Sequence, residues 1–599
     1  MQGDPVIFST FRKFSLFDLV PFLGLIFILT LLILNADRGF DLTDESYYLL
    51  CASAPAESLS PGTQFGHYTG LLFRLAGGNV PLFRIYGILL LLGAGLGFAF
   101  ALDVFLASRD HGDGSFPGKT GRVSVITLGV LAYYSPWMLT PSYNWLNLVS
   151  VLSALTALMK GSDISAEISR RKTLRHMLWS LLFGISCALS FMARPVTALA
   201  LGILSIAWIF RFFPKQNRAA FLILGTGSSI SLFVLHILFF EGTLSNYYHE
   251  LTAGLHLNSY FGAYTFQTIG QQALDDLISF PRRFLKVLGW MIPVLFFVKI
   301  SMRRGLIKRG VETLLVQFFT LVSWLALWTQ GFWQGGDRAA WENGFPGIAF
   351  YLALIMISCF VRSKNGAVPQ PGPLKQLPLY LVFASASFAI SSDNGLLRQM
   401  SLALGLLTAA TVVAAIRLDS GRTNRHCSGV VSLVLTAGVL LIFRGAYLAP
   451  YRLIAPISSQ TNPIELFAAP GKLHVDSKTK FYVEELQRAA LQAGWTKGTP
   501  LIDLTENPGA ALILNASAPV TPWLYGERYP GFTQAALEMA GSSVTQKAWV
   551  LSTPEKVPHR TPDDVLDHIG LNFPENYSET GTFRTGFRNR EQILWKPKS

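Results

Sequence analysis

Apolar residues run in long stretches along this chain, and polar residues gather between them. The stretches are roughly 17 to 25 residues long, the length at which an α-helix crosses about 30 Å of hydrocarbon. They predict thirteen membrane-spanning helices, near residues 16–35, 80–107, 123–140, 143–159, 177–193, 195–213, 221–240, 284–298, 311–330, 346–361, 377–390, 399–416 and 428–443. The pattern therefore predicts an α-helical polytopic membrane protein.

The composition agrees with this prediction and narrows the class of protein. Of the 599 residues, 51% are hydrophobic and only 14% are charged, whereas a soluble domain carries about 25% charged residues. This excludes a secreted enzyme, a nucleic-acid-binding protein and a disulfide scaffold. The net charge of +13 lies in the loops between spans, so it indicates orientation and no nucleic-acid partner.

The distribution of basic residues predicts the orientation. Alternate loops and span ends contain 24 Lys and Arg residues on one side, against 9 on the other side up to Arg398. By the positive-inside rule the N-terminus is cytoplasmic, and the first span is an uncleaved anchor. We therefore expect a protein of the plasma (inner) membrane of a bacterium. An odd number of spans then places the chain after residue 443 outside the cytoplasm.

The predicted organisation is a membrane domain, 1–443, followed by an extracytoplasmic α/β domain, 444–599. Long outer loops at 36–79, 241–283 and 331–345 indicate a site on the outer face. The C-terminal domain is predicted to contain strands at 473–476, 500–504 and 548–552, helices at 478–493 and 562–568, and a hairpin within 583–595. Because Asp476, Asp503 and Glu506 lie near strand ends without glycine-rich phosphate turns, we favour a role in acceptor docking or in covering the cleft.

Three carboxylates follow the first span, in the sequence RGFDLTDESYY from residue 38 to 48. Asp41, Asp44 and Glu45 could act as a general base toward an acceptor hydroxyl, or could bind a divalent cation that neutralises a phosphate leaving group. They could equally be solvated loop charges, with Thr43 or Asp44 as the cap of a helix.

This loop resembles a known class. An Asp-Glu pair followed by Tyr47 and Tyr48 in a long first outer loop is similar to the GT-C superfamily of polytopic glycosyltransferases, which includes protein O-mannosyltransferases and aminoarabinose transferases. The short turns at 141–147 and 193–198 are also similar to those of bacterial members. The resemblance implies transfer of a sugar, with inversion, from a polyprenyl-phosphate donor to an extracytoplasmic glycolipid, polysaccharide or protein.

The resemblance implies roles for these acids. Asp44 is the first candidate for the catalytic carboxylate, followed by Glu45 and then Asp41. Members of the superfamily divide into metal-using and metal-free enzymes, so Mg²⁺ or Mn²⁺ is a candidate cofactor, with Asp44 as its candidate ligand.

A lipid-phosphate donor requires cations at the membrane interface, and arginine suits a phosphate through planar, bidentate donation. The donor-phosphate candidates on the predicted outer face are Arg194, Arg338, Arg398 and Arg74. Arg194 is the most suggestive because it lies in a tight turn between two spans, although a snorkelling interfacial arginine would look the same.

Aromatic, amide and imidazole side chains on the same face could bind the sugar through stacking and hydrogen bonds. The candidates are Tyr47, Tyr48, His67, Asn144, Trp333 and His256. An interfacial aromatic belt is the alternative explanation for such aromatics.

Two other functions stay open at this stage. A transporter of a lipid-linked glycan would need charges deep within spans and matched halves, and neither is clear in this sequence. A glycan ligase or polymerase would use outer arginines and histidines in place of a carboxylate.

Overall fold

The computed structural model describes residues 15–59, 62–109, 118–162, 170–261, 376–390, 395–419, 427–526, 528–554 and 564–598, with isolated positions between 267 and 304. Three predicted spans, 284–298, 311–330 and 346–361, lie outside the described residues. The predicted outer loop 331–345 lies outside them too, and with it Trp333 and Arg338.

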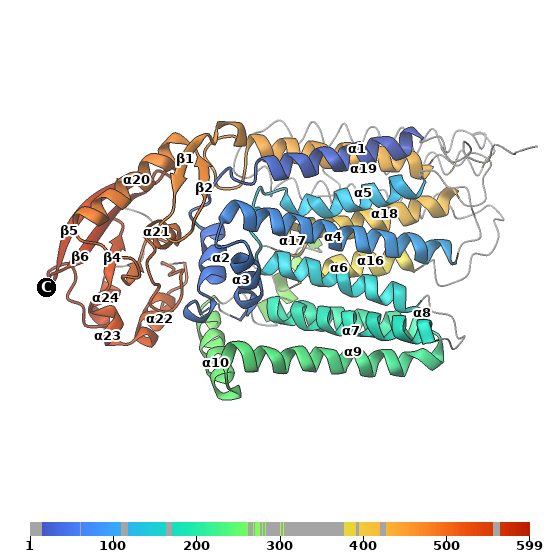
Figure 1. Cartoon of the computed structure of the whole chain (residues 1–599), viewed down its shortest axis with the longest axis horizontal. Helices are drawn as coiled ribbons and strands as arrows, with labels where there is room; N and C mark the ends of the chain where they lie inside the picture. The colour runs from blue at the N-terminus through green and yellow to red at the C-terminus, as the bar shows by residue number, and fades with distance from the viewer. Residues whose placement is uncertain are drawn as a thin grey trace, which may run out of the picture.

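The other ten predicted spans each overlap a described helix, and these helices run side by side (Figure 1). They are α1 (Leu16–Leu34), α4 (Val80–Ala107), α5 (Lys119–Leu131), α6 (Tyr143–Ser162), α7 (Arg170–Ala193), α8 (Pro195–Phe212), α9 (Lys215–His236), α16 (Leu377–Ala389), α18 (Leu404–Asp419) and α19 (Cys427–Leu448). The span predicted at 123–140 extends too far, because α5 ends at Leu131 and a 3-10 turn, Ala132–Tyr134, follows it. Seven helical stretches among the described residues are long and apolar enough to cross a membrane. The chain is a polytopic membrane protein.

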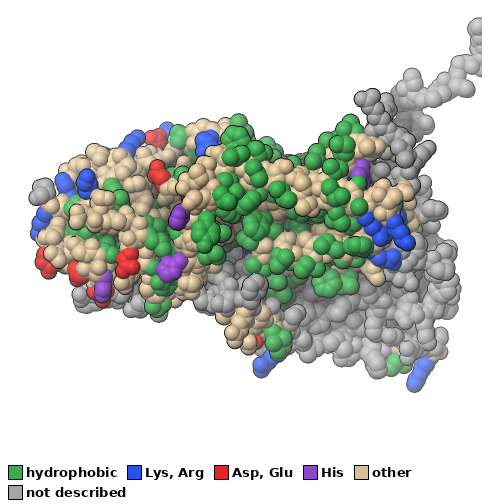
Figure 2. All heavy atoms as spheres, turned by 90° about the horizontal axis from the view of Figure 1, so that it is seen from below, with side chains coloured by type: hydrophobic (Ala, Val, Ile, Leu, Met, Phe, Trp, Pro, Cys, Tyr) green, Lys and Arg blue, Asp and Glu red, His purple; other side chains and the backbone are tan. Residues whose placement is uncertain are grey.

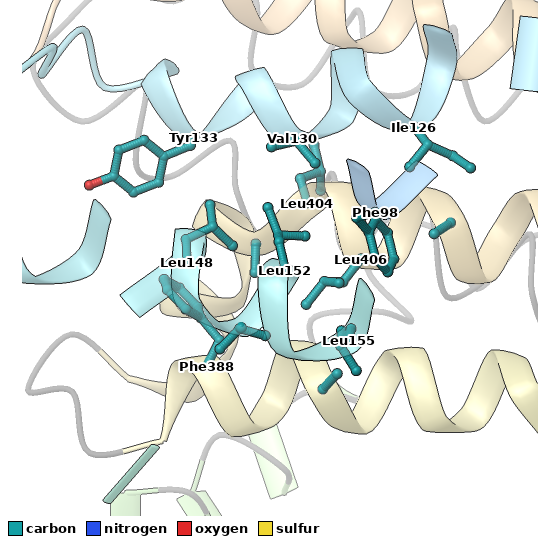
Figure 3. Packing of buried hydrophobic residues seen from close by; sticks show 14 of the residues in the cluster. Phe98, Ile126, Val130, Tyr133, Leu148, Leu152, Leu155, Phe388, Leu404 and Leu406 are labelled. Carbon is teal, nitrogen blue, oxygen red and sulfur yellow. The ribbon is translucent and has the colours of Figure 1, made fainter. Parts of the chain in front are cut away.

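Small residues allow the helices to approach closely. A Cβ on Gly405 of α18 would lie 2.8 Å from the backbone of Val130 in α5, so only glycine fits there. Membrane helices associate through such close packing because lipid offers no hydrophobic driving force between them. Figure 3 shows the result, with Phe98, Val130 and Leu152 interleaved between α4, α5, α6 and α18.

The described surface of this helical part is largely apolar, and Lys and Arg side chains gather at one of its ends (Figure 2). Hydrophobic side chains are numerous on the described part of the face shown in Figure 2, and Phe239, Ile203 and Ile223 are among the exposed hydrophobic residues of these helices. Lys and Arg side chains gather at the end far from the C-terminal domain (Figure 2), which is the end where α8 has Arg211 in its last turn and α9 begins with Lys215. This is the end that the sequence places in the cytoplasm.

Two amphipathic segments lie at the opposite end of the helices. The loop after α1 contains α2 (Asp44–Ser53) and α3 (Phe65–Leu75), and the chain after α9 makes a π-helical turn, Ile237–Glu241, before α10 (Leu244–Ser259). Both segments lie between the helical bundle and the C-terminal domain (Figure 1).

The C-terminal domain contains a mixed sheet with the strand order β3-β4-β6-β5. Its strands are β3 (Leu501–Asp503), β4 (Trp549–Ser552), β5 (Tyr577–Arg584) and β6 (Glu591–Pro597), and β3 pairs parallel to β4. A separate antiparallel pair consists of β1 (Asn462–Glu465) and β2 (Lys472–Val475). The predicted strands at 473–476, 500–504 and 548–552 and the predicted hairpin are confirmed.

The helices of this domain were predicted less completely. The described helices are α20 (Ser477–Gln492), α21 (Gly509–Leu514), α22 (Phe532–Ala540), α23 (Ser542–Thr545) and α24 (Asp564–His568). The sequence predicted α20 and the described part of 562–568, and it missed α21, α22 and α23. Asp476 is the N-cap of α20, because its side chain accepts hydrogen bonds from the Lys478 and Thr479 backbones.

The first outer loop and the C-terminal domain share one hydrophobic core. Phe40, Leu42 and Leu50 of the loop pack in the same cluster as Leu473 and Leu512. Backbone hydrogen bonds join the two parts as well: Gly39 N–H donates to His474 O, and Gly509 N–H donates to Leu42 O. These contacts hold the C-terminal domain against the segment that contains Asp41, Asp44 and Glu45.

Candidate active site

Asp41 is buried and organises the start of α2. Its carboxylate accepts hydrogen bonds from the backbone and hydroxyl of Thr43, and from the Glu45 N–H at 3.3 Å. Thr43 is the N-cap by position but makes no side-chain cap bond, so the capping that was predicted for Thr43 or Asp44 comes from Asp41. Burial raises the pKa of Asp41 to about 6, although Arg452 nearby acts in the opposite direction.

Glu45 is also buried and forms an ion pair with Arg84 of α4. Arg84 donates to Glu45 Oε1 from Nε at 3.0 Å and from Nη2 at 2.7 Å, and Thr140 donates to the same oxygen. The guanidinium also donates to Ala36 O and Gly39 O. These bonds fasten the first outer loop to α4, and Glu45 does not line the cavity described below.

Asp44 is the one acid of the three that lines a cavity. Its side chain is 22% exposed, and its Oδ2 lies 3.0 Å from Arg452 Nη1. The cavity, of about 230 Å³, lies between the membrane helices and the C-terminal domain. Its other polar wall residues are Tyr48, Tyr133, Ser142, Tyr143, Asn144, Tyr451, Arg452, Trp523, Tyr525, Arg528 and Tyr529.

Aromatic side chains from the membrane domain and from the C-terminal domain both line this cavity. Trp523 and Tyr525 are stacked with ring centroids 5.2 Å apart, and Tyr47 of α2 contacts Trp523 at 5.9 Å. The Trp523 Nε1 is buried and has no hydrogen-bond partner among the described residues. Aromatic faces with a spare N–H donor suit a sugar ring, which stacks through its C–H face and accepts hydrogen bonds at its hydroxyls.

A second cavity, of about 110 Å³, adjoins the first and is strongly basic. The two share Arg452, Trp523, Tyr525 and Arg528 as wall residues. Arg588 and Arg590 also line the second cavity, with Glu506 as its acid. Burial lowers the pKa of Arg588, and so do the charges of Arg590 and Arg452. We call this second cavity the arginine compartment.

The backbone at the arginine compartment is strained. Arg452, Glu506 and Arg588 adopt the left-handed region with φ of 55°, 57° and 61°, which residues with a Cβ rarely occupy. Such strain persists only where the surrounding structure imposes it, and it clusters at ligand sites.

Of the four arginines predicted to bind the donor phosphate, one is buried, two are exposed and one lies outside the described residues. Arg194 is buried between spans and donates to Asn144 Oδ1, Phe388 O and Ile390 O, so it stabilises the end of α16 directly behind the cavity wall. Arg74 of α3 and Arg398 of α17 (Leu396–Met400) are exposed and do not line either cavity. Arg338 lies outside the described residues.

Of the predicted sugar-binding residues, likewise, only some lie at the first cavity. Tyr48 and Asn144 line the first cavity, and Tyr47 packs on its Trp523 wall. His256 is exposed on α10, and Trp333 lies outside the described residues. His67 is buried against α9, and burial, with His236 and Arg74 as further causes, lowers its pKa to about 4.

Of the site residues in the C-terminal domain, only Glu506 was singled out from the sequence, as an acid near a strand end. Arg452, Trp523, Arg528, Arg588 and Arg590 come from loops without a motif. The only signal was the pairing of aromatic and basic residues in Pro522 to Tyr529 and in Phe587 to Arg590.

A metal at Asp44 stays a prediction. Among the described residues, one group of at least three His, Cys, Asp or Glu side chains has ligand atoms close enough for a shared ion, and it does not include Asp44.

Comparison with known proteins gives matches of structure only. No family model matches the sequence, and no curated protein matches it. Among solved structures, ArnT of Cupriavidus metallidurans bound to undecaprenyl phosphate is 10% identical over 96% of this chain and 97% of its own, with a TM-score of 0.43. The Archaeoglobus fulgidus oligosaccharyltransferase tethered with an acceptor peptide is 11% identical over 91% and 69%, with a TM-score of 0.45.

The arabinofuranosyltransferase AftD of Mycobacteria is 12% identical over 96% of this chain and 40% of its own, with a TM-score of 0.40. Glycosyltransferases with membrane spans are the class that the first outer loop resembles.

Proposed function

We propose that this protein is a membrane glycosyltransferase that moves a sugar from a polyprenyl-phosphate donor to an extracytoplasmic acceptor. The observation that supports this most directly is the position of Asp44, a partly exposed carboxylate in a cavity with aromatic and arginine walls. We further propose that the protein lies in the bacterial inner membrane, with its N-terminus cytoplasmic and its C-terminal domain outside.

Asp44 is the proposed general base. Its carboxylate accepts the proton of the acceptor hydroxyl while that oxygen attacks the anomeric carbon of the sugar. The bond between the anomeric carbon and the phosphate oxygen breaks, and its electron pair leaves with the polyprenyl phosphate. This is one displacement, so the anomeric centre is inverted.

Arginine stabilises the leaving phosphate in this proposal. Arg452 and Arg528 line the cavity together with Asp44, and a guanidinium can donate two parallel hydrogen bonds to a phosphate as its negative charge grows. Arg194, Arg74, Arg398 and Arg338 stay candidates from the sequence. Of these, Arg194 would act through Asn144, whose amide oxygen it contacts at 3.2 Å.

The acceptor is proposed to enter from the C-terminal domain, by way of the arginine compartment, because this compartment shares four wall residues with the Asp44 cavity. A divalent cation such as Mg²⁺ or Mn²⁺ beside Asp44 would supply charge neutralisation for the leaving phosphate.

Sugar transfer in membranes that contain the full chain tests the proposal. Polyprenyl-phosphate donors with different radiolabelled sugars are supplied, with and without chelator. We expect Asp44→Asn to lower the rate about 10²- to 10⁴-fold, the usual contribution of a general base. The matched control is Asp37→Asn, which removes an acid of the same loop that pairs with His474 away from the cavity.

Undiminished transfer in Asp44→Asn would contradict the proposal, as would passage of lipid-linked glycan across the membrane without any transfer. The first result would favour a ligase or polymerase, and the second a transporter. A loss of activity with chelator that only Mg²⁺ or Mn²⁺ restores would assign the metal role to this site.

A further inference from the structure

Two histidines and two glutamates converge away from the cavities, where α3 meets the end of α9. The ligand atoms of His67, Glu241 and Glu250 all lie within 4.8 Å of one another. His236 faces the same carboxylate, with its Nε2 3.6 Å from Glu241 Oε1, and His67 Nε2 lies 3.7 Å from that oxygen. Neither distance is a hydrogen bond.

Two of the atoms that face each other here are buried and have no hydrogen-bond partner among the described residues. His236 is 1% exposed, and its Nε2 has no hydrogen-bond partner among the described residues; the same holds for Oε1 of the buried Glu241. A buried polar atom without a partner costs about 1–3 kcal/mol. Such atoms persist in a folded protein when something absent from the polypeptide satisfies them.

The spacing suits one metal ion. With metal–ligand bonds of about 2.0–2.1 Å in a tetrahedron, neighbouring ligand atoms lie about 3.3 Å apart, which is close to the distances of 3.6 and 3.7 Å here. A cation would also relieve the repulsion between the Glu241 and Glu250 carboxylates, whose oxygens lie within 4.8 Å of each other.

Neighbouring side chains orient the candidate ligands. The Tyr68 hydroxyl lies 3.2 Å from His236 Nδ1, so the other ring nitrogen faces Glu241. Gln64 Nε2 donates to Glu250 Oε2 at 3.1 Å. Outer hydrogen bonds of this kind commonly hold metal-binding histidines and carboxylates in place.

The backbone places Glu241 in the cluster. The chain leaves α9 through the π-helical turn Ile237–Glu241 and turns at Gly242, which has a φ of 74°. A π-turn adds a residue to the helical turn and often lies at a functional site. Here it brings Glu241 beside His236 and directs α10, with Glu250, back toward α3.

We propose that His67, His236, Glu241 and Glu250 bind one zinc ion. Two imidazoles with carboxylates favour zinc over Mg²⁺ or Ca²⁺, which prefer oxygen ligands alone. The ion would fasten the first outer loop to the α9–α10 segment, two parts of the chain that border the candidate active site. The proposal does not depend on glycosyl transfer.

Elemental analysis of the full chain tests this directly. The chain is purified in detergent without a polyhistidine tag and dialysed against metal-free buffer. We expect one zinc per chain, and loss of that zinc in His67→Ala and His236→Ala. Tyr68→Phe should keep the ion but weaken its binding about tenfold, the size of a lost outer hydrogen bond. The matched controls are His249→Ala and His256→Ala, which remove exposed histidines of α10.

A cysteine variant keeps the test valid if the alanine variants fail to fold. His236→Cys retains a ligand atom, so it should bind Co²⁺ with the near-ultraviolet charge-transfer band of a cobalt–thiolate bond, and His67→Ala in the same chain should abolish that band. Chelator should lower the melting temperature of the wild type, and zinc should restore it. Folded wild type without zinc that also fails to take up added zinc would overturn the proposal, as would full zinc content in folded His67→Ala and His236→Ala.

Discussion

Asp41, Asp44 and Glu45 lie within five residues of one another, yet each has a different environment. Asp41 accepts backbone hydrogen bonds at the start of α2, Glu45 is paired with Arg84, and Asp44 lines the cavity. The helical geometry explains the division, because adjacent residues of a helix point about 100° apart. Asp44 and Glu45 therefore cannot serve the same side of α2.

The Glu45–Arg84 pair predicts a stability effect. Arg84 is 1% exposed, and removal of one partner of a buried pair leaves an uncompensated charge, at a cost of about 3–5 kcal/mol. We expect Arg84→Met to lower the melting temperature of the purified protein strongly. The double variant with Glu45→Gln should recover part of the loss, because it removes the stranded charge. Equal melting temperatures for Arg84→Met and the wild type would contradict the pairing.

Asp41 predicts a pH dependence of stability. Its pKa in the folded protein, about 6, lies above the ordinary 3.8, so the folded state binds the proton more tightly than the unfolded state. The resulting stabilisation is complete below pH 3.8 and is lost as the pH rises through about 6. We expect the melting temperature of the wild type, relative to Asp41→Asn, to fall between pH 4 and pH 6. Parallel curves for the two proteins would show that Asp41 is not the titrating group.

At the scale of elements, the periodicity of apolar residues predicted the helices and strands whose formation depends mainly on local sequence. The span at 80–107 coincides with α4, and the hairpin within 583–595 belongs to β5 and β6. Short α21 was missed because Gly509 to Leu514 carries no capping or amphipathic signal over six residues. Its helical form depends on packing against the first outer loop, which sequence periodicity does not report.

That packing predicts the effect of a single methyl group. A Cβ on Gly509 would lie 2.9 Å from Leu42 Cα and 3.0 Å from Leu42 O, closer than real Cβ contacts. We expect Gly509→Ala to separate α21 from the loop, lower the melting temperature and reduce sugar transfer. The control is Gly202→Ala in α8, where a Cβ would meet nothing within 4 Å. Equal melting temperatures and equal rates of sugar transfer for Gly509→Ala and Gly202→Ala would show that the close contact between Gly509 and Leu42 contributes to neither stability nor activity.

At the scale of the whole molecule, the candidate site is composite. Asp44 comes from the first outer loop and Asn144 from the start of α6, whereas Arg452, Trp523 and Arg528 come from the chain after the last span. These residues lie far apart in the sequence, and only the tertiary fold brings them together. The sequence could therefore single out Asp44, which lines the cavity, but not the aromatic wall or the arginine compartment.

The arginine compartment predicts how the acceptor is recognised. Arg588 and Arg590 line it without lining the Asp44 cavity, so their loss should weaken acceptor binding and leave the chemical step intact. We expect Arg588→Gln with Arg590→Gln to raise the KM for an acceptor that carries phosphate or carboxylate by at least about tenfold, with kcat nearly unchanged, since each lost charged hydrogen bond is worth about 1.5–3 kcal/mol. The readout is initial rates over a range of acceptor concentrations.

The salt dependence of the same rates separates a specific compartment from general surface charge. Added salt should raise the KM of the wild type and affect the double variant less, because screening acts on charges that the variant lacks. Arg584→Gln is the matched control, since it removes an exposed arginine of β5 that pairs with Glu591. An equal rise in KM for Arg584→Gln, or a fall in kcat with constant KM in the double variant, would place acceptor recognition elsewhere.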